Sequence, residues 1–134
     1  MASRELPDRW ILGIRDCAVS SVSLRSGTWS IQLTSGVEVV TDAEVRFQDM
    51  TRIGMAHAQA LPPADPVLLV GQQVASAVGF TSGVLRIVFR PGYHFVAVPR
   101  DGSVTRVRHA GAFEWVGSTG GGTLEWPDDS SGTR

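Results

Sequence analysis

Apolar and polar residues alternate along short stretches of this chain, and one such stretch occurs twice. The segment SGTWSIQLTSG occupies residues 26–36, and the similar segment SGVLRIVFRPG occupies residues 82–92, 56 positions later. In the first segment, Trp29, Ile31 and Leu33 alternate with polar residues. Alternation with a period of two predicts a β-strand with one buried face, and the flanking Ser-Gly and Pro-Gly pairs predict tight turns.

The repeat extends on both sides of these segments. Aligning each residue i with residue i + 56 needs no gap from Ala18 to Val40, and it pairs Val22 with Val78. Each copy predicts three antiparallel strands, which form a sheet with one apolar face that must be covered. Two such sheets can cover each other. The predicted fold class is therefore mainly β, with two pseudo-repeated antiparallel three-stranded meanders packed as a small sandwich or open barrel and at most one short helix.

The rest of the chain is divided around these two copies. We expect a single β domain over residues 1–126, with repeat one at about 12–47, a connector at 48–66, repeat two at about 67–109, a final hairpin at 111–126, and a disordered tail at 127–134. Residues 51–61 of the connector fit either a short helix or an irregular loop. Residues 1–7 are expected to form a loose arm.

Two segments that follow the repeats are expected to add strands. Residues 42–47 fit either an extension of the third strand or a separate strand. Asp101-Gly102 is a dipeptide typical of hairpin turns, so it predicts a hairpin that leads into a strand at 103–109. In the final hairpin, Phe113 and Trp115 are expected to share one inward face.

The composition is that of an ordinary globular protein. The chain has 134 residues, of which 43% are hydrophobic and 19% charged, a size at which one core forms without disulfides or metals. The single cysteine, Cys17, cannot form an internal disulfide and is expected to be a small buried residue rather than a nucleophile. The N-terminal residues contain no apolar run of signal-peptide length, so we expect a cytoplasmic protein without membrane association.

Positive charge is concentrated in the second repeat, although the whole chain has a net charge of −1. All twelve basic residues are arginines, and residues 71–110 contain five of them against one acid. Such a surface fits either a solvated sheet face or a docking site for an acidic protein, whereas the acidic flanks make nucleic acid an unlikely partner. If the strands concerned are neighbours, one basic patch results. The candidate partner-binding residues are Arg86, Arg90, Arg106 and Arg108, with Tyr93 and His94 at the margin.

No catalytic residue, metal site or cofactor is predicted. The three histidines, His57, His94 and His109, lack the local pairing typical of zinc ligands and are expected to be solvated or hydrogen-bonded. The glycine run 120–122 leads into a predicted strand rather than a helix, so it predicts a flexible hairpin loop instead of a phosphate site. Asp128-Asp129 lies in the expected tail, where paired carboxylates cannot hold a catalytic geometry.

A set of turn and core residues carries a family resemblance. They are Val74, Val78, Gly83, Leu85, Ile87, Phe89 and Gly92, followed by Trp115, Gly121, Gly122, Leu124 and Trp126. This pattern resembles a family of short actinobacterial proteins, a domain of unknown function with two β-meander repeats and a terminal G-G-x-L-x-W motif. The resemblance implies a fold and no activity.

Three functions fit these observations. The favoured one is a non-enzymatic cytoplasmic protein-interaction module of the adaptor, antitoxin or immunity type, with homodimerisation through edge strands also expected. The first alternative is a β domain that binds a small ligand in a pocket between its sheets. The second alternative is an enzyme of unknown class.

Overall fold

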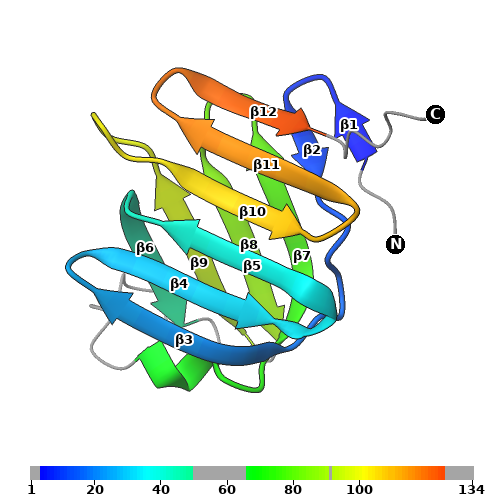
Figure 1. Ribbon diagram of the computed structural model, residues 1–134, viewed down its shortest axis with the longest axis vertical. Helices are drawn as coiled ribbons and strands as arrows, with labels where there is room; N and C mark the ends of the chain where they lie inside the picture. Colours follow the sequence, from blue (N-terminus) through cyan, green and yellow to red (C-terminus); the bar gives the residue numbers. More distant parts are fainter. Residues whose placement is uncertain (1–3, 50–65, 91, 126–134) are drawn as a thin grey trace.

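The chain forms a sandwich of two antiparallel sheets, each of six strands, in a computed structural model that describes residues 4–49, 66–90 and 92–125 (Figure 1). Sheet A contains, in spatial order, β1 (Arg4–Leu6), β2 (Arg9–Ile11), β7 (Gln73–Phe80), β8 (Leu85–Arg90), β9 (Tyr93–Val98) and β6 (Glu44–Asp49). Sheet B contains β12 (Gly121–Glu125), β11 (Phe113–Ser118), β10 (Thr105–His109), β5 (Val37–Thr41), β4 (Thr28–Leu33) and β3 (Val19–Arg25). Two short 3₁₀ turns, η1 (Thr34–Gly36) and η2 (Pro66–Leu69), complete the described elements.

The two repeats form one meander in each sheet, which confirms the predicted fold class. Strands β3, β4 and β5 lie side by side in sheet B, and β7, β8 and β9 lie side by side in sheet A. Their inward faces form a common core, in which Ile31 and Val39 of sheet B and Ile87 and Phe95 of sheet A are fully buried. Burial of this apolar surface from both sheets is the main favourable contribution to folding.

The repeat alignment is wrong in its first strand, where one residue must be skipped. Val22 pairs with Ile31, whereas Ile87 pairs with Ala77 rather than with Val78. The offset is therefore 55 in β3 and β7 but 56 in the next two strands. The turn after β3 has two residues, 26–27, with φ of 50° and 81°, as in a type I′ turn. The turn after β7 has three residues, 81–83. It is closed by a hydrogen bond from Phe80 N to Val84 O.

The strand that follows each meander joins the sheet of the other repeat. β6 pairs with β9 in sheet A, and β10 pairs with β5 in sheet B. Residues 42–47 therefore do not extend the third strand; the separate strand begins at Glu44. The turn at Asp101-Gly102 forms, with a hydrogen bond from Ser103 N to Arg100 O, but it is not a hairpin turn because it leads the chain from one sheet to the other.

The N-terminal residues are also more ordered than a loose arm. Residues 4–6 form β1, which pairs with β2, and β2 pairs with β7. At the other end of the chain, β11 and β12 form the expected hairpin. Phe113 and Trp115 both lie on its inward face, 5% and 0% exposed.

Glycines make room for the buried indole of Trp115. A Cβ atom at Gly79 of β7 would lie 2.4 Å from Trp115 Nε1. Gly117 and Gly122 also approach the indole at distances that leave no space for a side chain. The ring is therefore wedged between the two sheets at the end of the sandwich near β12.

Some predictions concern residues that lie outside the described ranges. These are the helix or loop at 51–61, Trp126 and the tail at 127–134. Within residues 4–49, 66–90 and 92–125, no helix has the length and hydrophobicity needed to cross a membrane.

Candidate partner-binding surface

The four predicted arginines lie on opposite sides of the sandwich. Arg86 and Arg90 alternate with buried residues along β8, so they lie on the outer face of sheet A. Arg106 and Arg108 alternate with buried residues along β10, so they lie on the outer face of sheet B. Because β8 and β10 belong to different sheets, the condition for a single patch of four arginines is not met.

The two neighbouring aromatic residues are also separated. Tyr93 stacks on the buried ring of Phe47, with centroids 5.0 Å apart, so it lies on the inward side of β9. His94 lies on the outer side and is in register with Val88 of β8 and Gln48 of β6. Of the six predicted residues, the outer face of sheet A therefore carries three: Arg86, Arg90 and His94.

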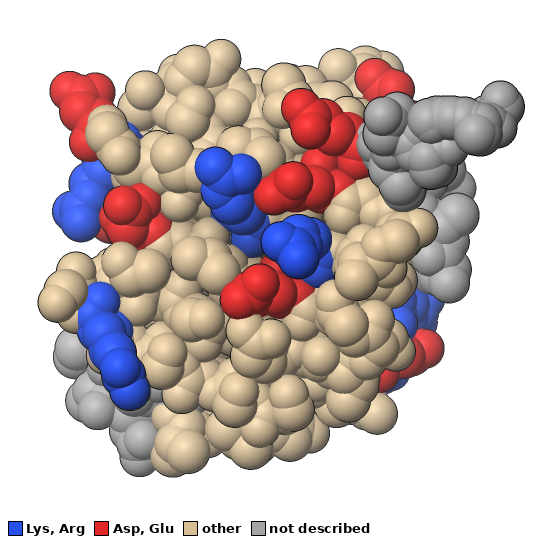
Figure 2. All heavy atoms as spheres, in the orientation of Figure 1, with Lys and Arg blue, Asp and Glu red and all other residues tan. Residues whose placement is uncertain are grey.

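The outer face of sheet B carries mixed charges. Arg108 is in register with Glu38 on one side and with Glu114 on the other. Arg106 donates to Glu114 across 3.3 Å. Figure 2 shows basic and acidic side chains interspersed on this face of the molecule. Since carboxylates surround both arginines, this face is not a basic patch.

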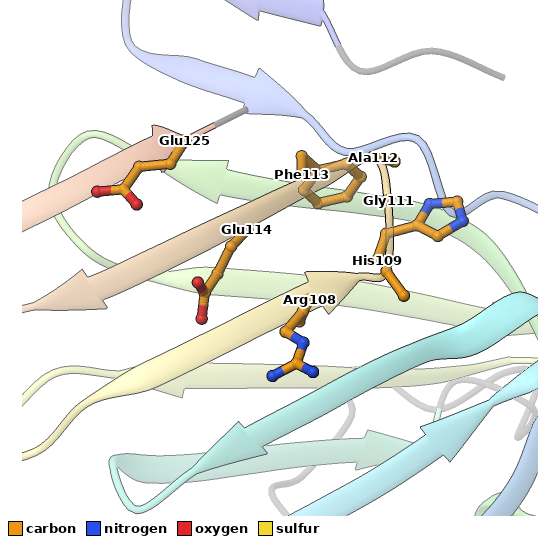
Figure 3. A pocket seen from close by; sticks show the side chains of 8 residues that line it. Arg108, His109, Gly111, Ala112, Phe113, Glu114 and Glu125 are labelled. Atoms are coloured by element: carbon orange, nitrogen blue, oxygen red, sulfur yellow. The ribbon is translucent and has the colours of Figure 1, made fainter. Parts of the chain in front are cut away.

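Two shallow hollows are formed by described residues. The first, about 290 Å³, lies at the β10–β11 hairpin and is lined by residues 108–114 and Glu125. In Figure 3, the imidazole of His109 and the carboxylates of Glu114 and Glu125 point in different directions. The second, about 250 Å³, lies among the loops at residues 26–28, 42 and 100–103. Neither is a pocket between the sheets, and neither brings ionisable groups together around one point.

The outer face of sheet A contains more apolar residues than that of sheet B. About half of the outward positions of β7, β8 and β9 hold valines or Phe80, and the others hold Gln73, Ser76, Arg86, Arg90 and His94. The apolar members are Val78, Phe80, Val88, Val96 and Val98, which we call the valine face. Val78 is only 6% exposed, yet it lies outside the core cluster between the sheets. Its burial therefore comes from side chains that lie across the outer surface.

Arg86 is one of the side chains that cover the valine face. It is in register with Val78 on one side and Val96 on the other. Its guanidinium carbon lies 5.8 Å from the centre of the Phe80 ring, a cation–π distance. Its Nε is buried and has no hydrogen-bond partner. A buried donor without an acceptor costs free energy in the isolated protein.

The other arginines of this face are paired. Arg90 donates to Asp16 at 2.6 Å, and Arg46 lies 3.4 Å from Glu44. The guanidinium carbon of Arg9 also lies near the Phe80 ring, 5.0 Å from its centre, and Arg9 bonds Asp8 at 2.9 Å. This hydrogen bond from Arg9 lowers the pKa of the Asp8 carboxyl below its ordinary value. Among the arginines described on the face, Arg86 thus stands out by having no carboxylate partner.

Residues with potential catalytic or metal chemistry are dispersed. Cys17 is 8% exposed and belongs to the core cluster. His109 packs edge-on against Phe113, 5.7 Å away, and His57 lies outside the described residues. No group of three or more His, Cys, Asp or Glu residues that could hold a metal ion occurs within the described ranges.

The valine face was missed by the sequence analysis, although a signal for it exists. In the first repeat, the apolar positions of β4 alternate with Ser30 and Gln32. In the second repeat, Val88, Val96 and Val98 occupy outward positions, so β9 is largely apolar on both sides and β8 has one valine between its two outward arginines. Near-continuous apolar strands are typical of a sheet that is covered on both faces.

Comparisons with known proteins give no further assignment: no family model, no curated protein and no solved structure matches the chain. The family resemblance therefore stays a prediction.

Proposed function

We propose that the protein is a non-enzymatic, cytoplasmic protein-interaction module that docks a partner on the valine face. The partner is a protein with a carboxylate set among apolar side chains. Adaptor, antitoxin and immunity proteins are examples of this class. The observation that carries the proposal is the buried, unpaired Nε of Arg86 in the middle of an outward-facing apolar surface.

The composition of the face supports docking. Protein interfaces are enriched in arginine and aromatic residues, and their centres are depleted of other charged residues. The valine face combines Arg86 and Phe80 with four valines. A guanidinium is planar and well suited to bidentate binding of a carboxylate. On docking, a shift of the half-buried Arg86 side chain would present its guanidinium to a partner carboxylate, which would accept the hydrogen bond that Nε lacks, while partner apolar groups would cover the valines.

The contrast with sheet B supports the choice of face. On that side Arg106 has Glu114 within 3.3 Å, and the charges are interspersed. Exposed ion pairs of this kind contribute little to binding or stability. A partner would have to displace them, whereas no carboxylate has to be displaced from Arg86.

The experiment replaces residues of the valine face with their counterparts from the first repeat. In one variant, Arg86→Ser and Val88→Gln introduce the residues found at Ser30 and Gln32. The matched control, Arg106→Ser with Val116→Gln, makes the same exchanges on the outer face of sheet B, where these two residues are in register. All three proteins are used to capture partners from native lysate, and captured proteins are identified by mass spectrometry, purified and titrated.

The wild type and the control are expected to bind the same partner, and the valine-face variant at least about tenfold more weakly. Binding by the wild type should also weaken at high salt. Equal binding by all three proteins, or no partner for the wild type at low salt, would contradict the proposal. Urea unfolding of each variant separates lost binding from lost folding.

A further inference from the structure

The four edge strands of the sandwich differ in how they discourage pairing with another chain. Charged residues and short length are the usual protection of an edge. β1 has three residues, β6 carries Glu44 and Arg46, and β12 ends at Glu125. β3 has seven residues, VSSVSLR, and carries no charge before Arg25. β3 is therefore the longest of the four edges; like β12 it carries its only charge at its last residue, and its register irregularity between Val19 and Ser21 precedes the stretch 21–25.

The backbone of β3 is open along most of its outer side. At the start of the strand, Val19 bonds Gly71 and Gln72, which occupy the position of a neighbouring strand. From residue 21 to residue 25, no described segment bonds the outer side. The two-residue turn at 26–27 makes Arg25 and Thr28 a hydrogen-bonded pair. By alternation, the N–H and C=O groups of Val22 and Leu24 point outward.

Exposed apolar side chains lie beside this open edge. η2 packs against β3 and lies beneath it in Figure 1. Val67 and Leu68 in this turn, and Val70 just after it, are 59%, 49% and 43% exposed. They are three of the four large hydrophobic side chains with high exposure in the described chain, the other being Val104. The open stretch of the β3 edge and an apolar cluster thus adjoin at one end of sheet B.

We propose that this region binds a second copy of the same chain, with β3 pairing antiparallel to β3 of the other copy. The twofold axis passes through Ser23. In this register, Val22 of each copy lies opposite Leu24 of the other copy. The outward-pointing backbone groups of these residues then form four hydrogen bonds between the two copies. Sheet B then continues as one sheet through both copies.

The sequence of β3 favours pairing with itself over pairing with a charged partner. A twofold interface uses the same surface patch on both copies, so that patch must be complementary to itself. In the proposed register, Arg25 lies opposite Ser21 of the second copy, and no like charges oppose each other. The η2 turn of each copy contacts its own β3, so its exposed apolar side chains lie near the joined strands. The inference is independent of the proposed function, because the valine face belongs to sheet A.

The test places charges on the twofold axis. Ser23 is exposed on the outer face, so Ser23→Lys should leave the fold intact while opposing two lysines. Ser30→Lys is the matched control, since Ser30 is the neighbour of Ser23 on the inner strand β4. Sedimentation velocity over a range of concentrations is expected to show a dimer for the wild type and for Ser30→Lys, and a dissociation constant at least about tenfold higher for Ser23→Lys. Leu68→Asp should weaken the dimer as well.

A charge-swap experiment tests whether Ser23 lies opposite Ser23 of the second copy. Ser23→Lys and Ser23→Glu should each be mainly monomeric alone, and an equimolar mixture should form a heterodimer. The proposal is overturned by a wild type that stays monomeric at every concentration, or by a dimer that Ser23→Lys does not weaken. Failure of the mixture to associate also overturns the register. Circular dichroism confirms that each variant is folded, and concentration-dependent protection of the Val22 and Leu24 amides from hydrogen exchange supplies an independent readout.

Discussion

The two meanders have similar apolar residues on their inward faces and different residues on their outward faces. Inside, Ile31 corresponds to Ile87 and both are fully buried. Outside, Ser23 corresponds to Val78, and Ser30 and Gln32 correspond to Arg86 and Val88. The shared inward pattern is what a common core requires. The outward difference has no such explanation, because both outer faces lie on the surface of the sandwich, and it therefore points to a use for the face of sheet A.

The largest expected effect tests whether the inward faces of the two meanders contribute equally to the core. It comes from truncating one buried residue at the centre of each meander. Ile31→Ala and Ile87→Ala should each lower the free energy of unfolding by about 2–5 kcal/mol, because each leaves a cavity in the same core. Urea unfolding followed by tryptophan fluorescence measures both. A cost at one position that is several times the cost at the other would show that the repeats do not contribute equally to one core.

A smaller effect is expected where the inward faces differ. Gly79 corresponds to the half-buried Leu24 of the first repeat, and a Cβ there would clash with Trp115. Gly79→Ala should therefore lower the unfolding free energy by about 1–3 kcal/mol.

A double mutant identifies the cause of that loss. Trp115→Phe supplies a smaller ring, so adding it to Gly79→Ala should cost less than the sum of the two single changes. Additive losses in urea unfolding would mean that the indole is not what excludes a side chain at residue 79.

On the outer face, Arg86→Met should leave stability unchanged or raise it by about 1 kcal/mol. The methionine keeps an apolar side chain over Val78 and Phe80, and it removes the buried Nε that has no acceptor. The same variant should lose the partner proposed for this face. Thermal unfolding and partner titration measure the two effects, and a marked loss of stability would show that Arg86 has a structural role instead.

The smallest predicted effect concerns the exposed pair beside the Phe80 ring. The hydrogen bond from Arg9 lowers the pKa of Asp8 below its ordinary value of 3.8. A carboxyl with a lowered pKa stabilises the folded state above 3.8, and this contribution disappears as the pH falls through the folded-state pKa. Carboxyl NMR titration should show the pKa of Asp8 below 3.8 in the wild type and higher in Arg9→Gln than in the wild type.

Most of the architecture could be predicted from the sequence, because the alternation of residues such as Ile31 and Ile87 depends on local strand geometry. The pairing of β6 with β9 could not, since residues 42–47 read as a strand in either sheet. The outward position of Val78 was missed because one extra turn residue, among 81–83, shifts the register and changes the face of the side chains from Ser76 to Phe80, whereas an irregularity between Val74 and Ser76 keeps Val74 in the core. The separation of Arg86 from Arg106 follows from the same crossovers and has no local signal.

The exchange of β6 and β10 between the sheets also affects the order in which the protein can assemble during synthesis. When the first repeat leaves the ribosome, β5 has β4 on one side, and its other side stays open until β10 has been made. β6 likewise has to wait for β9. Each repeat therefore needs a strand from the other repeat to complete its sheet. This connectivity is that of a strand-swapped dimer whose two subunits are joined in one chain.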